Sequence, residues 1–357
     1  MSDAVVRTGV GVLVDEGRIA AVDDAATLRR ETTHATIVDC DQGVLTPGFV
    51  DSHTHAIFGR ARYEEQEQRA AGVPYMEIAR RGGGIHASVR DLRERGENEL
   101  FALAEPRLRA LAASGVTTVE VKSGYGLTLE DELKSLRVIR RLAAALPMRI
   151  RATWLGAHEI PLEFRAREHG RREYIDLLVH VMLPAVARER LASFADVFCE
   201  PGVFTVDESR EILSAARTAG LAIKLHADEL VAGGGAELAG ELGAVSADHL
   251  AAVSDAGIAA LAAHDTVATL LPGTMLFLGK REQAPARRLV DAGVPVALAT
   301  DFNPGTSPTT NFPLVLTLGV SQLRLSVAEA MIAGTVNGAA ALGLAGRIGR
   351  ASCRERV

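Results

Sequence analysis

The feature that most constrains this chain is the alternation of short apolar runs with longer amphipathic segments. Eight apolar runs occur, at 49–55, 115–126, 148–158, 195–200, 221–229, 244–250, 265–273 and 294–305. Several of the intervening segments end in glycine just before the next run, as helix C-termini do. Eight such units over about 250 residues are the count and length of a (β/α)8 barrel. Alternation alone also allows a doubly wound open sheet, but no glycine-rich dinucleotide fingerprint follows the first run.

The composition narrows the partners and the compartment. The chain has 357 residues, 48% of them hydrophobic and 4% aromatic, and 39 basic side chains against 45 acidic ones give a net charge of −6. This balance argues against nucleic acid as the main partner. No apolar run is long enough to span a bilayer, and no signal peptide is recognisable at the N-terminus. Three widely spaced cysteines indicate neither a disulfide framework nor a zinc knuckle. We therefore expect a cytoplasmic protein that acts neither on nucleic acid nor at a membrane.

Polar side chains gather where the apolar runs end. All strand C-termini of a (β/α)8 barrel open onto one face, and active sites form there. Separate segments of the chain therefore direct histidines and carboxylates at one mouth. These residues are His53, His55, Lys122 to Tyr125, His158, Glu200, His226, Glu229, His249, Asp301 and Asn303.

Four of these residues predict a metal site. His53, His55, His226 and Asp301 offer nitrogen and oxygen ligands and leave one position for water, as catalytic zinc requires. A metal ion held in this way lowers the pKa of a water molecule toward neutrality. The His-x-His pair alone is weak evidence, because residues i and i+2 of any strand share a face. The ligand types suit zinc and iron alike.

Hydrolysis also needs groups that move protons and polarise the electrophile. Asp301 could take the proton of the water, Glu229 could shuttle protons, and His249 could polarise a carbonyl oxygen. Alternatively, Glu229 could cap the helix that follows it, and His249 could be a further metal ligand or orient one. We expect structural or solvated roles for the other five histidines, which are His34, His86, His169, His180 and His264.

The pattern of His-x-His after the first strand, histidines after the fifth and sixth, and aspartate after the eighth resembles the amidohydrolase superfamily. Within it, the ordered motifs resemble the imidazolonepropionase family over about residues 10–347: HTHAIFGRARYEE, ARRGGGI, TTVEVKSGYGL, LGAHEIP, KLHADE, SADHL and ATDFNPGTSP. The resemblance implies hydrolytic ring opening of 4-imidazolone-5-propanoate to N-formimidoyl-L-glutamate in histidine degradation. Many superfamily members that bind two metals carry a lysine on the fourth strand, and ADVFCE has none. One zinc or iron ion per chain is therefore implied.

The motifs also imply roles for individual residues and a homodimer. Arg62 offers a planar fork for the carboxylate of a small anionic substrate, although an arginine in a structural salt bridge is the alternative. Tyr75 is a further pocket candidate. The implied metal ligands are His53, His55, His226 and Asp301, and the implied catalytic residues are Glu229, His249 and Asp301. The implied substrate-binding residues are Arg62, Tyr125, His158, Glu229, Asn303, Gly305 and Thr306.

The chain ends predict a second, smaller domain. VGVLVDEGRIAAV (10–22) predicts a β-hairpin with Glu16 and Gly17 at the turn. The family builds a small β-sandwich from both termini and runs longer than this chain, so we expect this domain to be incomplete here. We assign 1–46 to it, 47–340 to the barrel and 341–357 to a C-terminal remnant. The last ten residues, IGRASCRERV (348–357), match a translated sequencing adapter, and we expect them not to be native.

Two other functions fit parts of the pattern. A mononuclear-metal deaminase of a purine or pyrimidine ring would share the metal ligands and differ in the pocket. A neutral base does not need the carboxylate clamp that Arg62, Tyr125 and His158 would form. An inactive barrel used as a binding protein would not need all four metal ligands, yet all four are present.

Overall fold

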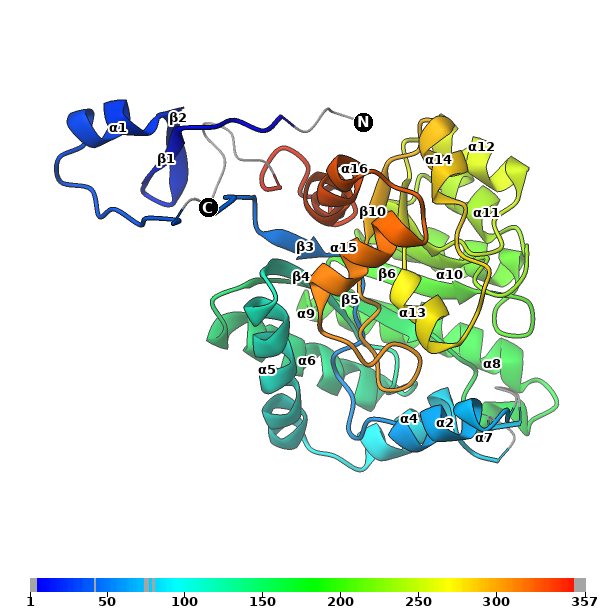
Figure 1. Ribbon diagram of the computed structural model, residues 1–357. Coiled ribbons are helices and arrows are strands. Elements are labelled where there is room, and N and C mark those ends of the chain that lie inside the picture. Colours follow the sequence, from blue (N-terminus) through cyan, green and yellow to red (C-terminus); the bar gives the residue numbers. More distant parts are fainter. Residues whose placement is uncertain (1–4, 42, 74–76, 79–80, 350–357) are drawn as a thin grey trace.

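The computed structural model describes residues 5–41, 43–73, 77–78 and 81–349 (Figure 1). Its centre is an eight-stranded sheet in which neighbours in sequence pair in parallel. Each predicted apolar run overlaps one of these strands, and only β6 begins before its run, by one residue, so the barrel prediction is confirmed. The strands are β3 (Phe49–Asp51), β4 (Val116–Lys122), β5 (Arg149–Ala157), β6 (Phe194–Cys199), β7 (Ala222–Ala227), β8 (Ser246–His249), β9 (Val267–Leu270) and β10 (Val296–Leu298).

The first and last strands meet just beyond their C-terminal ends. Thr54 forms a parallel bridge with Phe302, and the His55 amide donates to the Phe302 carbonyl at 2.8 Å. The Asp301 amide donates to the His53 carbonyl at 3.1 Å. This closure brings the two ends of the barrel sequence together, and with them three of the predicted metal ligands.

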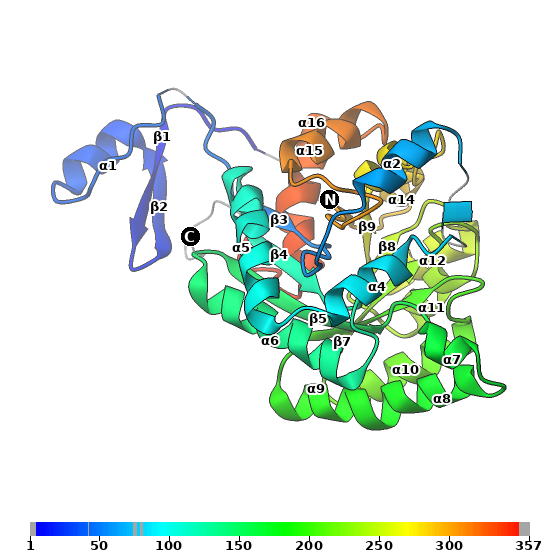
Figure 2. The same cartoon turned by 90° about the horizontal axis from the view of Figure 1, so that it is seen from below.

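Helices cover the outside of the strands, as Figure 2 shows for α5, α6, α8, α9 and α10. Their ends carry local signals: Thr205 and Glu208 form a capping box at the start of α10, and Gly220, at φ +87°, follows its end. The helical segments are α1 (Ala25–Glu31), α2 (Tyr63–Ala70), α4 (Ile85–Arg93), α5 (Glu97–Ala113), α6 (Leu129–Ala145), α7 (Leu162–Arg165), α8 (Gly170–Leu177), η1 (Leu178–Met182), α9 (Leu183–Glu189), α10 (Val206–Thr218), α11 (Gly235–Glu241), α12 (Asp255–Ala263), α13 (Pro272–Phe277), α14 (Ala286–Asp291), α15 (Phe312–Ser321), α16 (Val327–Ile332), η2 (Ala333–Asn337) and α17 (Gly338–Ala340).

The predicted N-terminal hairpin is present. Strands β1 (Val10–Asp15) and β2 (Arg18–Asp24) pair antiparallel, and Glu16 and Gly17 both have positive φ at the turn. The hairpin and α1 lie to one side of the barrel in Figure 1. Several apolar side chains in this part of the chain are exposed, namely Val5, Val6, Val10, Val14, Ile37, Val38, Val44 and Leu45. The domain boundaries and the β-sandwich stay predictions.

Some expectations fall outside the described residues. Tyr75 and the tail from residue 350, including Cys353, are among them. Ile348 is described and packs with Val50 and Leu342. Cys40 and Cys199 carry free thiols. Among the helices that the structure describes, none is long and apolar enough to cross a membrane.

Candidate metal and substrate site

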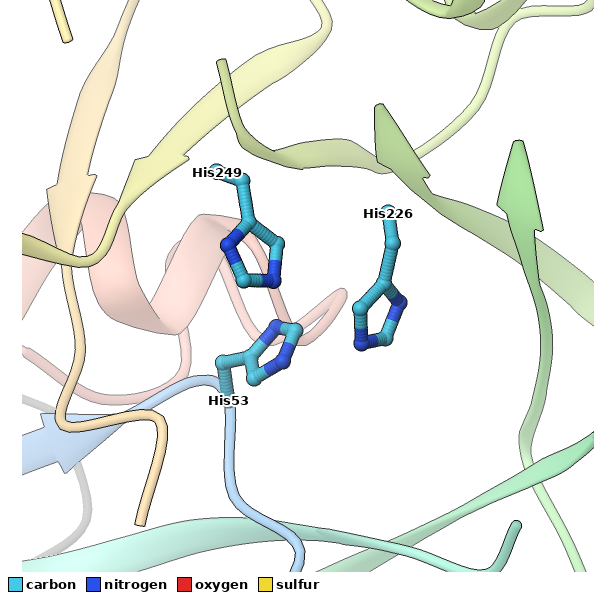
Figure 3. A group of neighbouring side chains, drawn as sticks. All are labelled: His53, His226 and His249. Atoms are coloured by element: carbon cyan, nitrogen blue, oxygen red, sulfur yellow. The ribbon is translucent and has the colours of Figure 1, made fainter. Parts of the chain in front are cut away.

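The predicted metal ligands converge at the C-terminal ends of the strands. His53 follows β3, His226 lies on β7 and Asp301 follows β10. The His55 Nε2 atom lies 3.2 Å from His53 Nε2 and 3.3 Å from His226 Nε2. Asp301 Oδ1 lies 3.6 Å from the Nε2 atoms of both His53 and His55. All four side chains are buried. Figure 3 shows His53 and His226 pointing toward one another, with His249 beside them.

The protonation of these imidazoles fits a cation between them. His53 Nδ1 lies 2.6 Å from Asp248 Oδ2, which can only accept, so His53 carries its proton on Nδ1 and turns a lone pair inward on Nε2. Burial and the Lys122 ammonium hold the pKa of His53 and of His226 well below the usual range. Ligands placed tetrahedrally at about 2.1 Å from a metal ion lie about 3.4 Å apart. Inward lone pairs at 3.2–3.3 Å, together with a carboxylate, therefore match the donor set of a metal site.

A buried ionic network lies beneath the histidines. It contains two lysines and three carboxylates, all fully buried, and so carries one net negative charge. Lys122 Nζ lies 2.7 Å from Asp196 and 2.9 Å from Glu120, and Lys224 Nζ lies 2.9 Å from Glu120. Both ammonium groups lie 3.6 Å from Asp248 Oδ2. A buried charge is tolerated only when it is paired in this way.

This network fixes two of the metal-site histidines. Asp248 holds His53 as described, and Asp196 accepts from the His226 amide at 3.1 Å. Asp196 Oδ2 also lies 3.0 Å from His226 Nδ1, although the approach does not have hydrogen-bond geometry. Burial works against ionisation of Asp248, but the two lysines hold the pKa of its carboxyl below the usual value. Asp248 therefore stays charged, and it and Asp196 orient imidazoles whose pKa values are lowered, as partners of metal ligands do.

Sequence reasoning missed most of this network. Glu120, Asp196, Lys224 and Asp248 were not singled out, and Lys122 was noted only as a polar residue at the end of a run. The signal was present in the strands themselves. VEVK (119–122) and IKLH (223–226) place charged residues at alternate positions of apolar runs, which is the period of one strand face. A charge on the interior face of a barrel needs a partner on a neighbouring strand.

The proposed proton carriers lie beside the four predicted metal ligands, which we call the metal cluster. Burial, followed by the charges of Asp301 and Glu200, raises the pKa of Glu229 to about 8. Its Oε2 lies 3.6 Å from His249 Nδ1, and burial lowers the pKa of His249 to about 4. Burial also raises the pKa of Asp301 to about 7, while the Thr274 hydroxyl, which donates to Oδ2 at 2.6 Å, opposes the rise. The site therefore offers a neutral histidine and a carboxyl that holds its proton near neutral pH.

The capping alternative for Glu229 is not what the structure shows. Its neighbour Asp228 accepts from the amides of Gly235 and Ala236 at the start of α11 and from Gly233 before it. The Glu229 amide is itself held by Glu200, at 3.0 Å. The Glu229 side chain is thus left for the site.

Arg62 is buried between the loops after β3 and β10, where its amide donates to the Pro304 carbonyl at 2.6 Å. Its Nη1 donates to the Ser88 hydroxyl, and its Nε lies 3.0 Å from Glu65 Oε1. A Cβ atom on Gly305 would lie 2.0 Å from Arg62 Nη2, so glycine is what lets the guanidinium lie against the loop. The structural salt bridge considered as the alternative for Arg62 is present, with Glu65, while Nη2 faces Gly305.

The side chains of Asn303 and Thr306 are engaged within their own loop. Asn303 Oδ1 accepts from the amides of Gly305 and Thr306 at 2.9 and 2.7 Å, and Nδ2 donates to the Asp301 carbonyl at 2.7 Å. These bonds give Asn303 a role in shaping the loop after Asp301. That either side chain contacts substrate stays a prediction.

Tyr125 and His158 lie beside His55. The His158 ring stacks on His55 with centroids 5.1 Å apart, and the Tyr125 ring lies 5.3 Å from His158. His158 Nδ1 lies 2.9 Å from the Gly124 carbonyl, which only accepts, so Nδ1 carries the proton and Nε2 is an acceptor. Burial lowers the pKa of His158 to about 4, and the Arg62 charge contributes to this, so the imidazole is neutral. The remaining five histidines lie outside this cluster, as expected.

Comparison with known proteins identifies the family of this chain. The model of the amidohydrolase family matches residues 76–351. An imidazolonepropionase from Symbiobacterium thermophilum is 49% identical over 353 residues, which are 98% of this chain and 82% of that protein. This chain is an amidohydrolase of the imidazolonepropionase family. A second imidazolonepropionase, from Geobacillus kaustophilus, is 46% identical with the same two coverages. The family predicted from the motifs is thus confirmed.

Solved structures with more distant sequences confirm the fold of this amidohydrolase. A zinc-bound adenosine deaminase from Xanthomonas campestris matches with a TM-score of 0.71 at 18% identity, over 99% of this chain and 80% of that one. A 5-methylcytosine deaminase from Klebsiella pneumoniae matches with a TM-score of 0.67 at 17% identity, over 94% of this chain and 84% of that one. At these identities the likeness concerns the fold alone.

Proposed function

We propose that this site opens the ring of 4-imidazolone-5-propanoate by adding water across the cyclic amide C–N bond, which gives N-formimidoyl-L-glutamate in histidine degradation. The observation that supports this substrate is the buried Arg62 guanidinium, which lies close enough to His158 to lower its pKa, while His158 stacks on His55 of the metal cluster. A carboxylate bound by Arg62 would place a short planar ring beside the cluster. Family membership supports the same reaction.

The residues divide the chemistry among them. His53, His55, His226 and Asp301 would hold one metal ion, zinc or iron. When bound there, the ion would polarise the amide carbonyl and lower the pKa of a water molecule. The remaining steps are assigned to groups of the chain itself.

Binding and proton transfer fall to different residues. Arg62 binds the propanoate carboxylate, and His158 accepts a hydrogen bond from a ring N–H through Nε2. His249 lies on the side of the cluster where it can contact the carbonyl oxygen. Asp301 takes the proton of the attacking water. Glu229, which is protonated near neutral pH, gives a proton to the ring nitrogen as the C–N bond breaks.

The test is direct turnover. The substrate is generated from urocanate with urocanase, and its absorbance is followed after adding metal-loaded protein. Mass spectrometry should show a product that has gained one water, and no ammonia should be released. Ammonia release from adenosine, guanine or cytosine, without loss of imidazolonepropionate absorbance, would replace this proposal with the deaminase. Metal analysis of the active protein decides between zinc and iron, and sedimentation tests the proposed homodimer.

A further inference from the structure

Glu132 is a buried carboxylate that the proposed reaction does not use. It lies in the first turn of α6 and is fully buried. Among the described residues, no lysine, arginine or histidine lies within ion-pair distance of it, in contrast to Glu120, Asp196 and Asp248. Its Oε1 accepts instead from three backbone amides, those of Gly124, Gly126 and Leu127, at 3.1, 2.9 and 3.1 Å. Burial raises the pKa of Glu132, and the Ser123 hydroxyl together with the three amides opposes this rise.

The loop that Glu132 holds is closely packed at both of its glycines. Gly124 has φ +108°, and a Cβ atom there would lie 3.0 Å from His158 Nδ1. Gly126 packs so closely on α6 that a Cβ atom would lie 2.6 Å from the Glu132 backbone nitrogen. Two of the amides bound by Glu132 thus belong to residues without side chains, and the carboxylate supplies the fixed point that such a loop otherwise lacks.

The same loop shapes the substrate pocket. Tyr125 lies between the two glycines, and its ring contacts those of His55 and His158. The Gly124 carbonyl accepts from His158 Nδ1 and so selects the tautomer with an acceptor at Nε2. A shift of this loop would move Tyr125 and release the His158 tautomer together.

We propose that Glu132 is a positioning residue for the substrate pocket: its carboxylate gathers three amides of the loop at 124–127 and thereby places Tyr125 and His158. The proposal rests on the proposed function for its consequence in substrate binding, and on the hydrogen bonds alone for the anchoring of the loop. What matters is the reach of Oε1, because this one oxygen accepts from all three amides.

Two substitutions distinguish the position of the acceptor oxygen of Glu132 from the charge of its carboxylate. Glu132→Asp keeps the charge and withdraws the acceptor by about 1.5 Å, the length of one C–C bond. Glu132→Gln keeps an oxygen at the position of Oε1 and removes the charge. Glu130→Asp is the matched control, because Glu130 lies in the same helical turn and is exposed.

Two measurements are made on metal-loaded protein. In Glu132→Asp, the KM should rise about tenfold with kcat per bound metal within about threefold of the starting enzyme, because binding geometry is lost while the reacting groups stay. Glu132→Gln should raise KM less than Glu132→Asp does, because its amide oxygen still reaches the three N–H groups although it accepts from them more weakly, and Glu130→Asp should keep KM within about threefold. Hydrogen exchange of the amides at 124–127 should quicken at least about tenfold in Glu132→Asp and remain slow in the control.

Each measurement has an outcome that would contradict the proposed role of Glu132. A larger KM defect in Glu132→Gln than in Glu132→Asp would mean that charge matters rather than reach and would overturn the proposal. Equal amide exchange in Glu132→Asp and the starting enzyme would remove the anchor altogether. If the starting enzyme does not turn over imidazolonepropionate, the proposed function fails, and the exchange measurement still decides whether Glu132 holds the loop.

Discussion

Gly305 offers a sharp test of the Arg62 pocket. Replacing it with alanine would place the new Cβ atom 2.0 Å from Arg62 Nη2 and 2.5 Å from its Cζ. Contacts of real Cβ atoms below 3.0 Å are essentially unknown, so the guanidinium must move by at least 1 Å. The atoms that move are the end of a flexible side chain, so the fold should tolerate the change. The substitution should, however, turn the Arg62 guanidinium out of the orientation in which it could bind a substrate carboxylate.

The size of the effect follows from the interaction that is lost. Hydrogen bonds to charged groups contribute about 1.5–3 kcal/mol each. Loss of one charge-assisted bond between Arg62 and the substrate carboxylate should therefore raise KM by about 10–100-fold. The three atoms nearest to the new Cβ atom all belong to Arg62 and none to a reacting group, so kcat should change by less than about threefold.

The assay is steady-state turnover of imidazolonepropionate, with thermal unfolding measured alongside. Gly96→Ala is the control, because Gly96 has an ordinary φ of −79° and open space around its Cβ position. Both variants should unfold near the temperature of the starting enzyme, and only Gly305→Ala should show the raised KM. An unchanged KM in Gly305→Ala would refute the assignment of Arg62 to the substrate carboxylate.

Three further changes address the metal and proton-transfer groups. Asp248→Asn should weaken metal affinity about 10–100-fold in chelator competition, because His53 loses its charged partner, while exposed Asp255→Asn should not. Turnover should fall as pH rises through about 8, where Glu229 loses its proton, and Glu229→Gln should lose about 100-fold or more in kcat together with that pH dependence. Lys122→Met should cost about 3–5 kcal/mol in denaturant unfolding because it leaves the buried Asp196 carboxylate without its lysine, whereas Arg109→Met, at an exposed helix pair with Glu105, should cost under about 1 kcal/mol. A stable Lys122→Met protein, or a pH profile of Glu229→Gln like that of the starting enzyme, would contradict these assignments.

The barrel could be predicted because its signals are local. A parallel strand buried on both faces is a short apolar run, and the helix that follows it often ends at a glycine. Each β/α unit can therefore be predicted from its own residues. The positions of His53 and Asp301 at strand ends then followed from the shared direction of the strands. Their final approach depends on the closure between Thr54 and Phe302, which the barrel topology supplies.

The ionic network could not be predicted in the same way, because its partners come from four strands that are distant in sequence. Asp196 and Lys122 are neighbours only once the order and stagger of the strands are known. The loop bonds made by Asn303 and Glu132 have the same character. In the sequence each is an ordinary polar residue, and only the folded loop shows which amides it accepts from.

The division between strand ends and loops explains why this chain shares its fold with deaminases and its motifs with imidazolonepropionases. Attack of water on a cyclic amide and on a purine or pyrimidine ring both need an activated water and a proton for the departing nitrogen. The groups for this lie at strand ends, where barrel hydrogen bonding fixes them. We propose that substrate selection falls to the loops that carry Arg62, Tyr125 and Gly305. If this division is correct, Gly305→Ala should change KM and leave metal affinity intact, and Asp248→Asn should do the reverse. If either substitution changed KM and metal affinity equally, the metal ligands and the substrate-binding loops would be one coupled unit.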